Sequence, residues 1–573
     1  NTNIVPSWHS LNSYSLASAY VSDDFFGMMD DNEGMMENSD KLDIAVGRIL
    51  ADSPQRATDL VDKISDYYNA NSYGDWRNKL IVISDDVDEP WESIIQGTSN
   101  SLADLISDNK PFFNVKKILS DAYVQESSSG GERYPEVNKA IIDGIELGAL
   151  AVNYFGHGGE DGIARERIFD KIDATELSNE NKLNCFVSVT CEFTKFDNPG
   201  RNTAGEFLYW NKNGGAIALI TTTRQIFVSV GVNFNLTLEN YLFSLNSDNY
   251  HTMAEALRLT KNDPSISGSD QRRLVFFIGD PAMKLAIPKP NIRITEINDI
   301  LINEFTEPLQ GLSSVKIEGQ IDDEFGNKID DYQGELVTTV FDKNIERSTL
   351  GNDGTSQNDS PIILDFTTLG EVLFRGRSSI ENGDFSVNFI VPRDVVMEVG
   401  NGKISFYSKS NSSLMDQNGS NLDILIGGIN ENAAEDNIGP EIELFMNDEA
   451  FISGGITNEN PHLLVKLFDE NGINTSSGIG HDIVAVLDDD VANSFRLNDY
   501  YEANLDDYQN GTINYPLRDI SPGLHTLSLK AWDVYNNSST SEIQFVVHDQ
   551  DQELVISNVL NYPNPFINFL DFW

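Results

Sequence analysis

A histidine and a cysteine each follow a short apolar run, and these two residue types together can perform nucleophilic catalysis. His157 lies between glycines directly after the run 151–155, and Cys191 directly follows the run 184–190. A thiol is mostly protonated near neutral pH, so a cysteine nucleophile needs an imidazole that takes its proton and later protonates the leaving amine. The spacing therefore predicts a Cys–His peptidase or acyl transferase.

The glycines around His157 give the same loop a second use. They let the backbone approach a substrate closely, and the amides of Gly158 and Cys191 can then donate to the oxyanion that forms on the substrate carbonyl. Spacing alone leaves a structural alternative open. His157 would then lie in a glycine-rich turn, and Cys191 would be a small core residue, as free cysteines often are.

The elements that must position these residues belong to the first half of the chain. Up to about residue 288, apolar runs of strand length alternate with helical patterns. The expected strands are residues 42–50, 79–84, 149–155, 185–190 and 215–221, and the expected helices are residues 57–68 and 137–147. This alternation predicts a mostly parallel sheet with helices on both faces. Reactive residues of such a sheet lie at the carboxyl ends of its strands.

Several blocks of sequence carry a resemblance to known families. Four of them resemble the catalytic domain of the gingipain-type cysteine peptidases: Tyr154–Gly159, Ser188–Glu192, Gly214–Ile220 and Phe277–Leu285. This resemblance implies an α/β caspase-like catalytic domain with Cys191 as nucleophile and His157 as its base. Blocks further along the chain resemble the surface sortases of the type IX secretion system: Lys316–Ile321, Phe389–Asp394, Gly472–Gly478, Ile479–Ala485 and Leu560–Phe566.

A third catalytic residue would be a carboxylate that orients the imidazole and favours its charged form. The run 81–86 ends in two acids, and the gingipain resemblance implies an acidic partner of the histidine at this point. Matching the strand and its serine assigns that role to Asp86, with Asp85 as a close rival. The alternative is that Asp85, Asp86 and Asp88 form a solvated loop or cap the helix that begins near Pro90.

The composition is strongly acidic and contains two cysteines. The chain has 39 Lys plus Arg against 90 Asp plus Glu, a net charge of −51. Such a field repels phosphate backbones and anionic headgroups, which excludes nucleic acid as a partner. Two cysteines exclude a disulfide framework, and pairing them would consume the nucleophile. Cys185 alternates with Val187 and Val189, so we expect it in the core.

The second half of the chain has a different texture. From Pro288 onward, short alternating runs are separated by turn signals such as Asn352-Asp-Gly354 and Asn382-Gly383, a pattern typical of antiparallel β-sandwiches. We expect a catalytic domain over 1–288, Ig-like all-β sandwich domains over 290–427 and 438–549, and a linker with the start of a secretion and anchoring domain over 550–573. The opening at Asn1 without a signal peptide suggests a processed piece of a longer secreted precursor.

Catalysis by a thiol requires no cofactor, but the acidic loop 23–33 is a candidate structural calcium site. Calcium prefers six to eight oxygen ligands, and this loop concentrates carboxylates. Its five acids are Asp23, Asp24, Asp30, Asp31 and Glu33. Glu192, Arg201 and Arg224 follow the catalytic strands and are candidates for substrate contacts, although a salt bridge is the simpler interpretation for each of them.

Three functions fit these observations. The first is an exported sortase at the outer-membrane surface, for which the resemblance implies cargo with type IX C-terminal domains, a lipopolysaccharide acceptor and an outer-membrane barrel of the PorV type as anchor. The second is a secreted endopeptidase of the gingipain type. The third is a noncatalytic surface adhesin in which the Cys–His pair is vestigial, and the intact His157 and Cys191 weigh against it.

Overall fold

The computed structural model describes residues 5–11, 19–476, 480–548, 561–562 and 571–572. The chain divides into two compact units. The first contains Asn1–Ala434 with Leu505–Tyr508, and the second contains Glu435–Asn504 with Gln509–Trp573. Of the predicted linker 550–573, only the pairs Asn561–Tyr562 and Asp571–Phe572 lie within the described residues. In the described residues, no helix combines the length and the apolar character needed to cross a bilayer.

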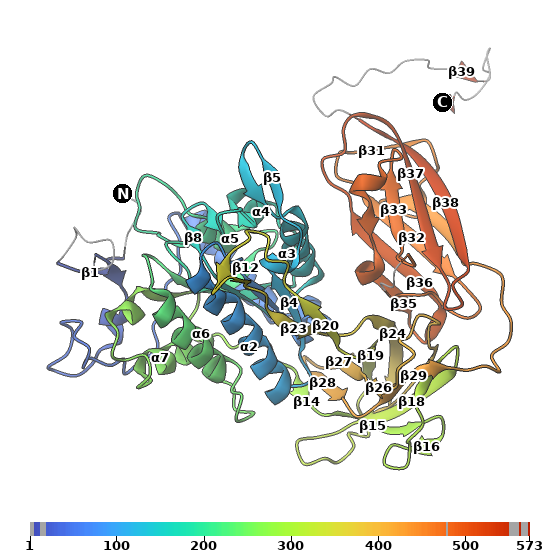
Figure 1. Cartoon of the computed structure of the whole chain (residues 1–573), viewed down its shortest axis with the longest axis horizontal. Helices are drawn as coiled ribbons and strands as arrows, with labels where there is room; N and C mark the ends of the chain where they lie inside the picture. The colour runs from blue at the N-terminus through green and yellow to red at the C-terminus, as the bar shows by residue number, and fades with distance from the viewer. Residues whose placement is uncertain (1–4, 12–18, 477–479, 549–560, 563–570, 573) are drawn as a thin grey trace. The chain divides into compact units, whose positions relative to one another are not determined.

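A six-stranded sheet forms the centre of the first half of the chain (Figure 1). Its strands, in spatial order, are β13 (Val275–Ile278), β12 (Ala216–Thr222), β11 (Asn184–Ser188), β7 (Ala151–Phe155), β3 (Lys79–Ser84) and β4 (Asn114–Leu119). All neighbours are parallel except β12 and β13. Parallel strands place their carboxyl ends at one edge, so the predicted parallel sheet is confirmed.

Helices cover both faces of this sheet because its buried strands are apolar on both sides. In β3, Leu80 and Val82 face one core and Ile81 and Ile83 face the other. The first core takes residues from α2 (Ser93–Asn109), α6 (Val228–Leu242) and α7 (Met253–Asn262). The second takes residues from α3 (Pro135–Leu147), α4 (Lys171–Glu176) and α5 (Ala204–Trp210), and α1 (Pro54–Tyr67) contributes to both.

The expected strand over residues 42–50 does not form. Only an isolated bridge between Arg48 and Ile278 joins this segment to the outer strand β13. The side chain of Arg48 turns instead to Asp23, which lies 2.5 Å from its Nε. A buried ion pair at this position replaces the ladder that the apolar run predicted.

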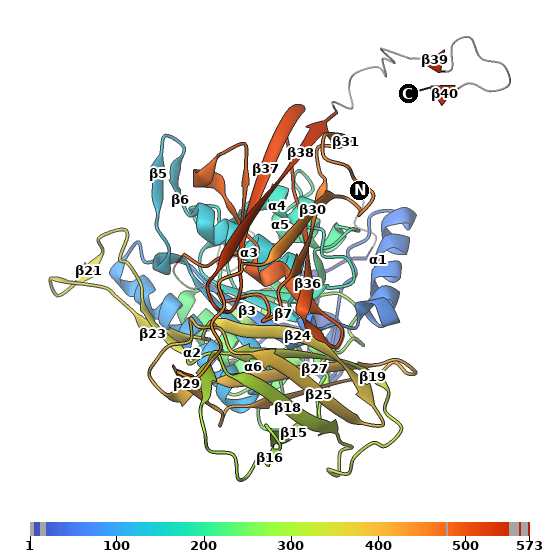
Figure 2. The same cartoon turned by 90° about the vertical axis from the view of Figure 1, so that its right-hand side faces the viewer.

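The chain continues into a large sheet that packs on its own core and is antiparallel except where its edge strand Lys289–Pro290 pairs in parallel with Gln417 and Asn418. Its order is β14 (Lys289–Pro290), β28 (Asp416–Asn421), β27 (Lys403–Ser410), β19 (Gly334–Phe341), β24 (Val372–Glu381), β25 (Asp384–Ile390), β18 (Ser314–Ile321), β15 (Ile292–Ile297) and β16 (Ile300–Leu301). Figure 2 shows its central strands side by side. A three-stranded sheet adds β17 (Leu309–Gly311), β29 (Leu425–Ile429) and β26 (Gly400–Asn401). At the β24–β25 turn, Asn382 and Gly383 both have positive φ, as the Asn-Gly signal predicts.

Polar contacts join this β-domain to the catalytic half within the first unit. Arg77 Nη1 lies 2.6 Å from the Asp416 carboxylate, and both side chains are largely buried. Lys403 Nζ donates to the carbonyl of Phe113 at 2.6 Å. An extension of the β-domain also reaches the catalytic half. It is the segment between β20 (Ile345–Ser348) and β23 (Asp365–Thr368), and it carries the short strands β21 (Ser356–Gln357) and β22 (Ser360–Pro361). These contacts explain why both parts belong to one compact unit.

The second unit contains two facing sheets around a separate core. One has the order β30 (Glu441–Met446), β32 (His462–Phe468), β36 (Asp507–Pro516) and β35 (Tyr501–Asn504). The other has the order β31 (Gly455–Thr457), β38 (Ser538–Val547), β37 (Gly523–Trp532), β33 (Val484–Leu487) and β34 (Phe495–Arg496). Their alternating burial is the pattern that the sequence showed.

Candidate active site

His157 follows β7 and Cys191 follows the adjacent parallel strand β11. Ser188 of β11 pairs with Tyr154 of β7, and each reactive residue comes three positions after its partner in this pair. Both side chains are partly exposed. The strand register thus brings the imidazole and the thiol to the same edge of the sheet.

The two loops that carry these residues contact each other directly. Thr190 Oγ1 donates to the carbonyl of Gly156 at 2.7 Å. A Cβ on Gly158 would lie 2.6 Å from the same Oγ1, so any larger residue at position 158 would push the loops apart. Tyr154 also braces the turn, because its hydroxyl donates to the carbonyl of His157 at 2.6 Å.

Gly158 opens a tight hairpin whose geometry leaves its amide available. β8 (Gly158–Gly159) pairs with β9 (Gly162–Ile163), and β10 (Phe169–Asp170) extends this small sheet. The carbonyl of His157 accepts from the amide of Ala164 at 2.9 Å. Narrow and wide pairs alternate in an antiparallel ladder, so the amide of Gly158 points out of the hairpin. This orientation suits the predicted oxyanion donor.

The imidazole of His157 faces a carboxylate at each of its nitrogens. Nδ1 lies 2.9 Å from Asp85 Oδ2, and Nε2 lies 3.1 Å from Glu92 Oε1. Both carboxylates are buried, and the ring of Trp91 packs edge-on against the imidazole. The hydrogen bond with Asp85, reinforced by the charges of Asp85 and Glu92, raises the pKa of His157 against the opposing effect of burial.

The assignment of Asp86 as the partner of His157 is corrected by this geometry. Asp86 Oδ2 accepts from the Tyr134 hydroxyl at 2.9 Å and from Gln125 at 3.4 Å, not from the imidazole. Successive side chains of an extended segment point to opposite faces, so only one of the two adjacent acids can face the histidine. Burial, followed by the charges of Asp85 and Glu166, raises the pKa of Asp86 to about 9.

The two cysteines differ in their surroundings. Cys185 is fully buried in the core of the sheet, as expected, and its pKa is strongly raised by burial. Cys191 is partly exposed. Burial raises its pKa as well, while a hydrogen bond from the backbone amide of Ile226 acts in the opposite direction. Of the two, Cys191 is therefore the thiol that a substrate can reach.

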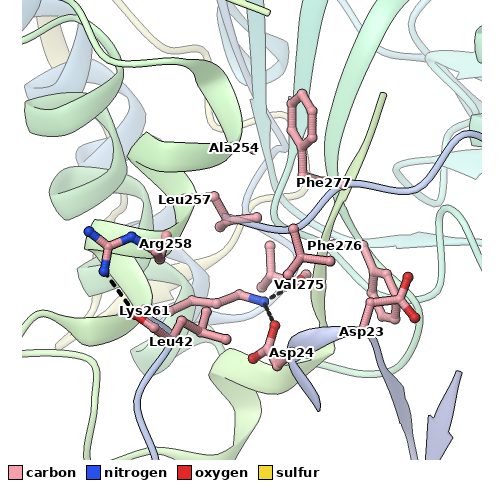
Figure 3. A pocket seen from close by; sticks show the side chains of 12 residues that line it. Asp23, Asp24, Leu42, Ala254, Leu257, Arg258, Lys261, Val275, Phe276 and Phe277 are labelled. Atoms are coloured by element: carbon pink, nitrogen blue, oxygen red, sulfur yellow. Dashed lines mark hydrogen bonds and ion pairs between the residues drawn. The ribbon is translucent and has the colours of Figure 1, made fainter. Parts of the chain in front are cut away.

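The five acids of the loop 23–33 do not gather around one point. The prediction that Asp23 and Asp24 bind calcium is corrected, because both pair with basic side chains. The carboxylate of each of these two residues is neutralised by basic side chains of the protein. Asp24 lies 2.6 Å from Lys261 Nζ (Figure 3). It also lies 3.1 Å from Arg273 Nη1, and Asp23 pairs with Arg48.

The other three acids of this loop are not brought to Asp23 and Asp24. Asp30 and Asp31 are exposed. Glu33 accepts from the backbone amide of Lys41 at 3.0 Å, which closes the loop on itself. In the part of the chain that the structure describes, none of the five acids belongs to a group of three or more potential metal ligands.

The three residues considered for substrate contacts all form ion pairs. Arg224 pairs with Asp197 at 2.5 Å, Glu192 with Lys195 at 2.7 Å, and Arg201 with Asp161. Glu192 and Arg201 also line a hollow beside Gly159. The hollow has mixed charge, so the simpler interpretation as salt bridges describes these residues.

Glu92 and Trp91 are contacts of His157 that sequence reasoning missed. A local signal for Glu92 was present, because Glu89 and Glu92 flank Pro90 with the spacing of a capping box. Glu92 Oε2 indeed accepts from the amide of Glu89 at 2.8 Å, which leaves Oε1 to face the imidazole. The pattern predicts the cap but not the second contact.

One protein family and several solved structures are similar to this chain. A model of peptidase family C25 matches residues 1–286, about half of the chain. Among solved structures, dimeric latent PorU from Porphyromonas gingivalis is 21% identical over 98% of this chain and 46% of that one, with a TM-score of 0.30. The Arg-specific cysteine proteinase gingipain R is 15% identical over 70% of this chain and 78% of that one, with a TM-score of 0.39.

The chain thus spans less than half of the PorU structure that it matches. No curated protein matches it. The family assignment depends on the first half, where the sheet, His157 and Cys191 lie. The chain belongs to peptidase family C25, a family of cysteine peptidases, through the domain that residues 1–286 form.

Proposed function

We propose that this protein is a cell-surface sortase of the type IX secretion system, with a caspase-like catalytic domain and Ig-like sandwiches. It would cleave the C-terminal domain from exported cargo and transfer the cargo to lipopolysaccharide. The observation that supports the chemistry most is the shared register of His157 and Cys191, with Asp85 on the imidazole. The sortase assignment follows from the sequence blocks after residue 288, which resemble those enzymes.

In the first step, the thiol of Cys191 gives its proton to His157, and the sulfur attacks the scissile carbonyl of the cargo. The amides of Gly158 and Cys191 hold the oxyanion. Collapse of this intermediate breaks the peptide bond, and the imidazolium donates its proton to the leaving amine. The products are a thioester on Cys191 and a released C-terminal domain.

His157 must exchange one contact to do this, since both of its nitrogens face carboxylates. Asp85 also accepts from the backbone amide of His157, so its contact is anchored at two points. The contact with Glu92 is therefore the one that the imidazole gives up for the thiol.

In the second step, an amine of lipopolysaccharide attacks the thioester and regenerates the thiol. A transferase has to limit competing hydrolysis, which requires a site that holds the acceptor and excludes water. We assign this task to the β-domain that follows residue 288 within the first unit. The segment around Asn561 would lead into an anchoring domain that binds an outer-membrane barrel of the PorV type.

The alternative function is a secreted endopeptidase, in which water resolves the same thioester. Family membership fits both functions, because they share Cys191, His157 and the first step. The adhesin hypothesis has less support, since an accessible thiol and an imidazole held by Asp85 follow adjacent strands at one edge of the sheet.

A labelled cargo protein with its C-terminal domain distinguishes the two. Full-length enzyme is incubated with cargo, with and without purified lipopolysaccharide, and the new carboxyl end is identified by mass spectrometry. A sortase diverts the product from free acid to amide when the acceptor is present. Free acid in both reactions would establish the endopeptidase, and intact cargo in both would overturn the enzymatic proposal.

A further inference from the structure

Five carboxylates gather behind the histidine loop. Asp85, Asp86 and Glu166 each place a carboxylate oxygen within 4.8 Å of the other two, and all three residues are buried. Asp86 belongs to a second group of the same spacing with Asp88 and Asp353. Asp85, Asp86 and Asp88 follow β3. Glu166 follows β9, and Asp353 comes from the segment between β20 and β23.

Basic side chains neutralise only part of this group, with His157 on Asp85 and Arg165 on Asp88. Among the described residues, Arg165 pairs with Asp88, and no lysine or arginine pairs with Asp85, Asp86 or Glu166. Buried charges are normally paired, because removal from water costs several kcal/mol for each ion. The group Glu296, Asp299 and Glu318 in the β-domain differs, since Lys316 pairs with both Asp299 and Glu318 there.

An independent observation is that two carboxylate oxygens in this cluster have no hydrogen-bond partner although water does not reach them. They are Asp85 Oδ1 and Asp353 Oδ2. The Asp85 residue is only 1% exposed, and its other oxygen is fully used by His157. A buried, unpartnered acceptor is costly, and it is the state expected of a ligand atom whose cation is missing.

The structure assigns the group Asp85, Asp86 and Glu166 to a divalent cation, with Asp353 beside it in the neighbouring group that shares Asp86. The donors are all carboxylate oxygens, which favours hard cations, and several carboxylates in an irregular arrangement suit calcium better than magnesium. Asp85 would use Oδ1 for the ion while Oδ2 holds His157. Cation binding at this cluster does not depend on the proposed sortase activity. The role of the bound ion in holding Asp85 against the imidazole of His157 does rest on that proposed function.

The segment that carries Asp353 is fixed on the catalytic half by several hydrogen bonds. The amides of Gly351 and Asn352 donate to the Asp121 carboxylate at 3.1 and 2.9 Å. Thr355 Oγ1 donates to the carbonyl of Asp88 at 2.9 Å. The cation would therefore connect three segments: the end of β3, the hairpin after His157 and this extension of the β-domain.

Calcium binding by the full-length chain tests the assignment. Protein stripped with a chelator is titrated with calcium chloride and, separately, magnesium chloride by calorimetry, and the melting temperature is measured with and without each ion. We expect one calcium per chain at this site, a higher melting temperature, and weaker binding of magnesium. Glu166→Gln and Asp353→Asn should each weaken calcium binding about tenfold or more, the scale for loss of a charged ligand or its support.

The matched control is the double variant Asp30→Asn/Asp31→Asn, which changes the exposed acidic loop and should keep calcium affinity. Circular dichroism of each stripped variant separates loss of a ligand from loss of the fold. Cys191→Ala should bind calcium like the wild type, so failure of the sortase proposal leaves this result intact. Absence of calcium binding would overturn the site, and so would binding that only the double variant Asp30→Asn/Asp31→Asn removes. Protons shared among the carboxylates would then relieve their repulsion.

Discussion

Asp85 holds His157 at two points. Its Oδ2 accepts from the backbone amide of His157 at 2.7 Å and lies 2.9 Å from Nδ1 of the same residue. The carboxylate thus fixes both the loop and the ring that the loop carries. The amide contact also ties the end of β3 to the turn after β7, so the orientation of the imidazole depends directly on the pairing of these two strands.

We expect Asp85→Asn to lower kcat/KM for cargo cleavage by roughly 10² to 10⁴, because the neutral amide cannot stabilise the imidazolium and can select the wrong tautomer. Asp86→Asn, which changes the carboxylate beside Tyr134, should have a smaller effect. Steady-state cleavage of a labelled cargo by both variants measures the difference. A larger loss for Asp86→Asn would return the role to that residue.

The cysteines should separate reactivity from packing. Cys191→Ala should abolish cleavage while leaving the melting temperature nearly unchanged, since its side chain is partly exposed. His157→Ala should also abolish cleavage but lower the melting temperature, because the buried carboxylates of Asp85 and Glu92 lose their contact with the imidazole. Cys185→Ala should keep the chemistry and lose stability, by about 1 kcal/mol for one buried sulfur atom, on the scale of large-to-small core substitutions. Mass mapping after alkylation by a thiol reagent should find the label on Cys191, and a label on Cys185 alone would contradict the assignment.

Removal of the carboxylate beside Nε2 should free the imidazole for the thiol. In Glu92→Ala we expect faster alkylation of Cys191 near neutral pH than in the wild type, because His157 loses the contact that competes with it. Glu89→Ala is the control, since it disturbs the same capping box without touching the histidine. Equal rates in both variants would mean that Glu92 acts only as a cap.

Glu239 should make stability depend on pH. It is buried beside Asn153, and burial raises its pKa from 4.5 to about 8. A raised pKa in the folded state means that the folded protein binds the proton more tightly, so the contribution of Glu239 to stability is greatest below pH 4.5 and falls as the pH rises toward about 8. Glu239→Gln should remove this fall. Urea unfolding of both proteins from pH 5 to pH 9 is the measurement, and parallel profiles would rule out the effect.

The ion pair between Arg77 and Asp416 should stabilise the first unit. Arg77→Ala would leave a buried carboxylate without its partner, at a cost of about 3 kcal/mol in the free energy of unfolding. Arg77→Ala combined with Asp416→Asn should recover part of this loss. Lys316→Ala, at an exposed pair, serves as the control and should change little. A full loss retained in the double variant would indicate that packing of the arginine, not its charge, is responsible.

Local sequence patterns determined much of the catalytic half. The apolar run 79–84 became β3 with the same bounds, and the run before His157 became β7. Burial on both faces requires such continuous apolar strands, which is why β3, β7, β11 and β12 were predicted from the chain itself. The strands β4 and β13 were not predicted, and the run 42–50 did not form a strand. The positions of His157 and Cys191 at strand ends were legible for the same reason.

Tertiary structure decided the details that depend on distant partners. Asp85 and Asp86 are neighbours in sequence, and only the pairing of β3 with β7 determines which of them faces His157. Likewise, Asp24 is neutralised by Lys261 and Arg273, which lie 237 and 249 residues away along the chain. A local pattern records how a segment alternates between faces, but the charge that meets it there comes from another part of the fold.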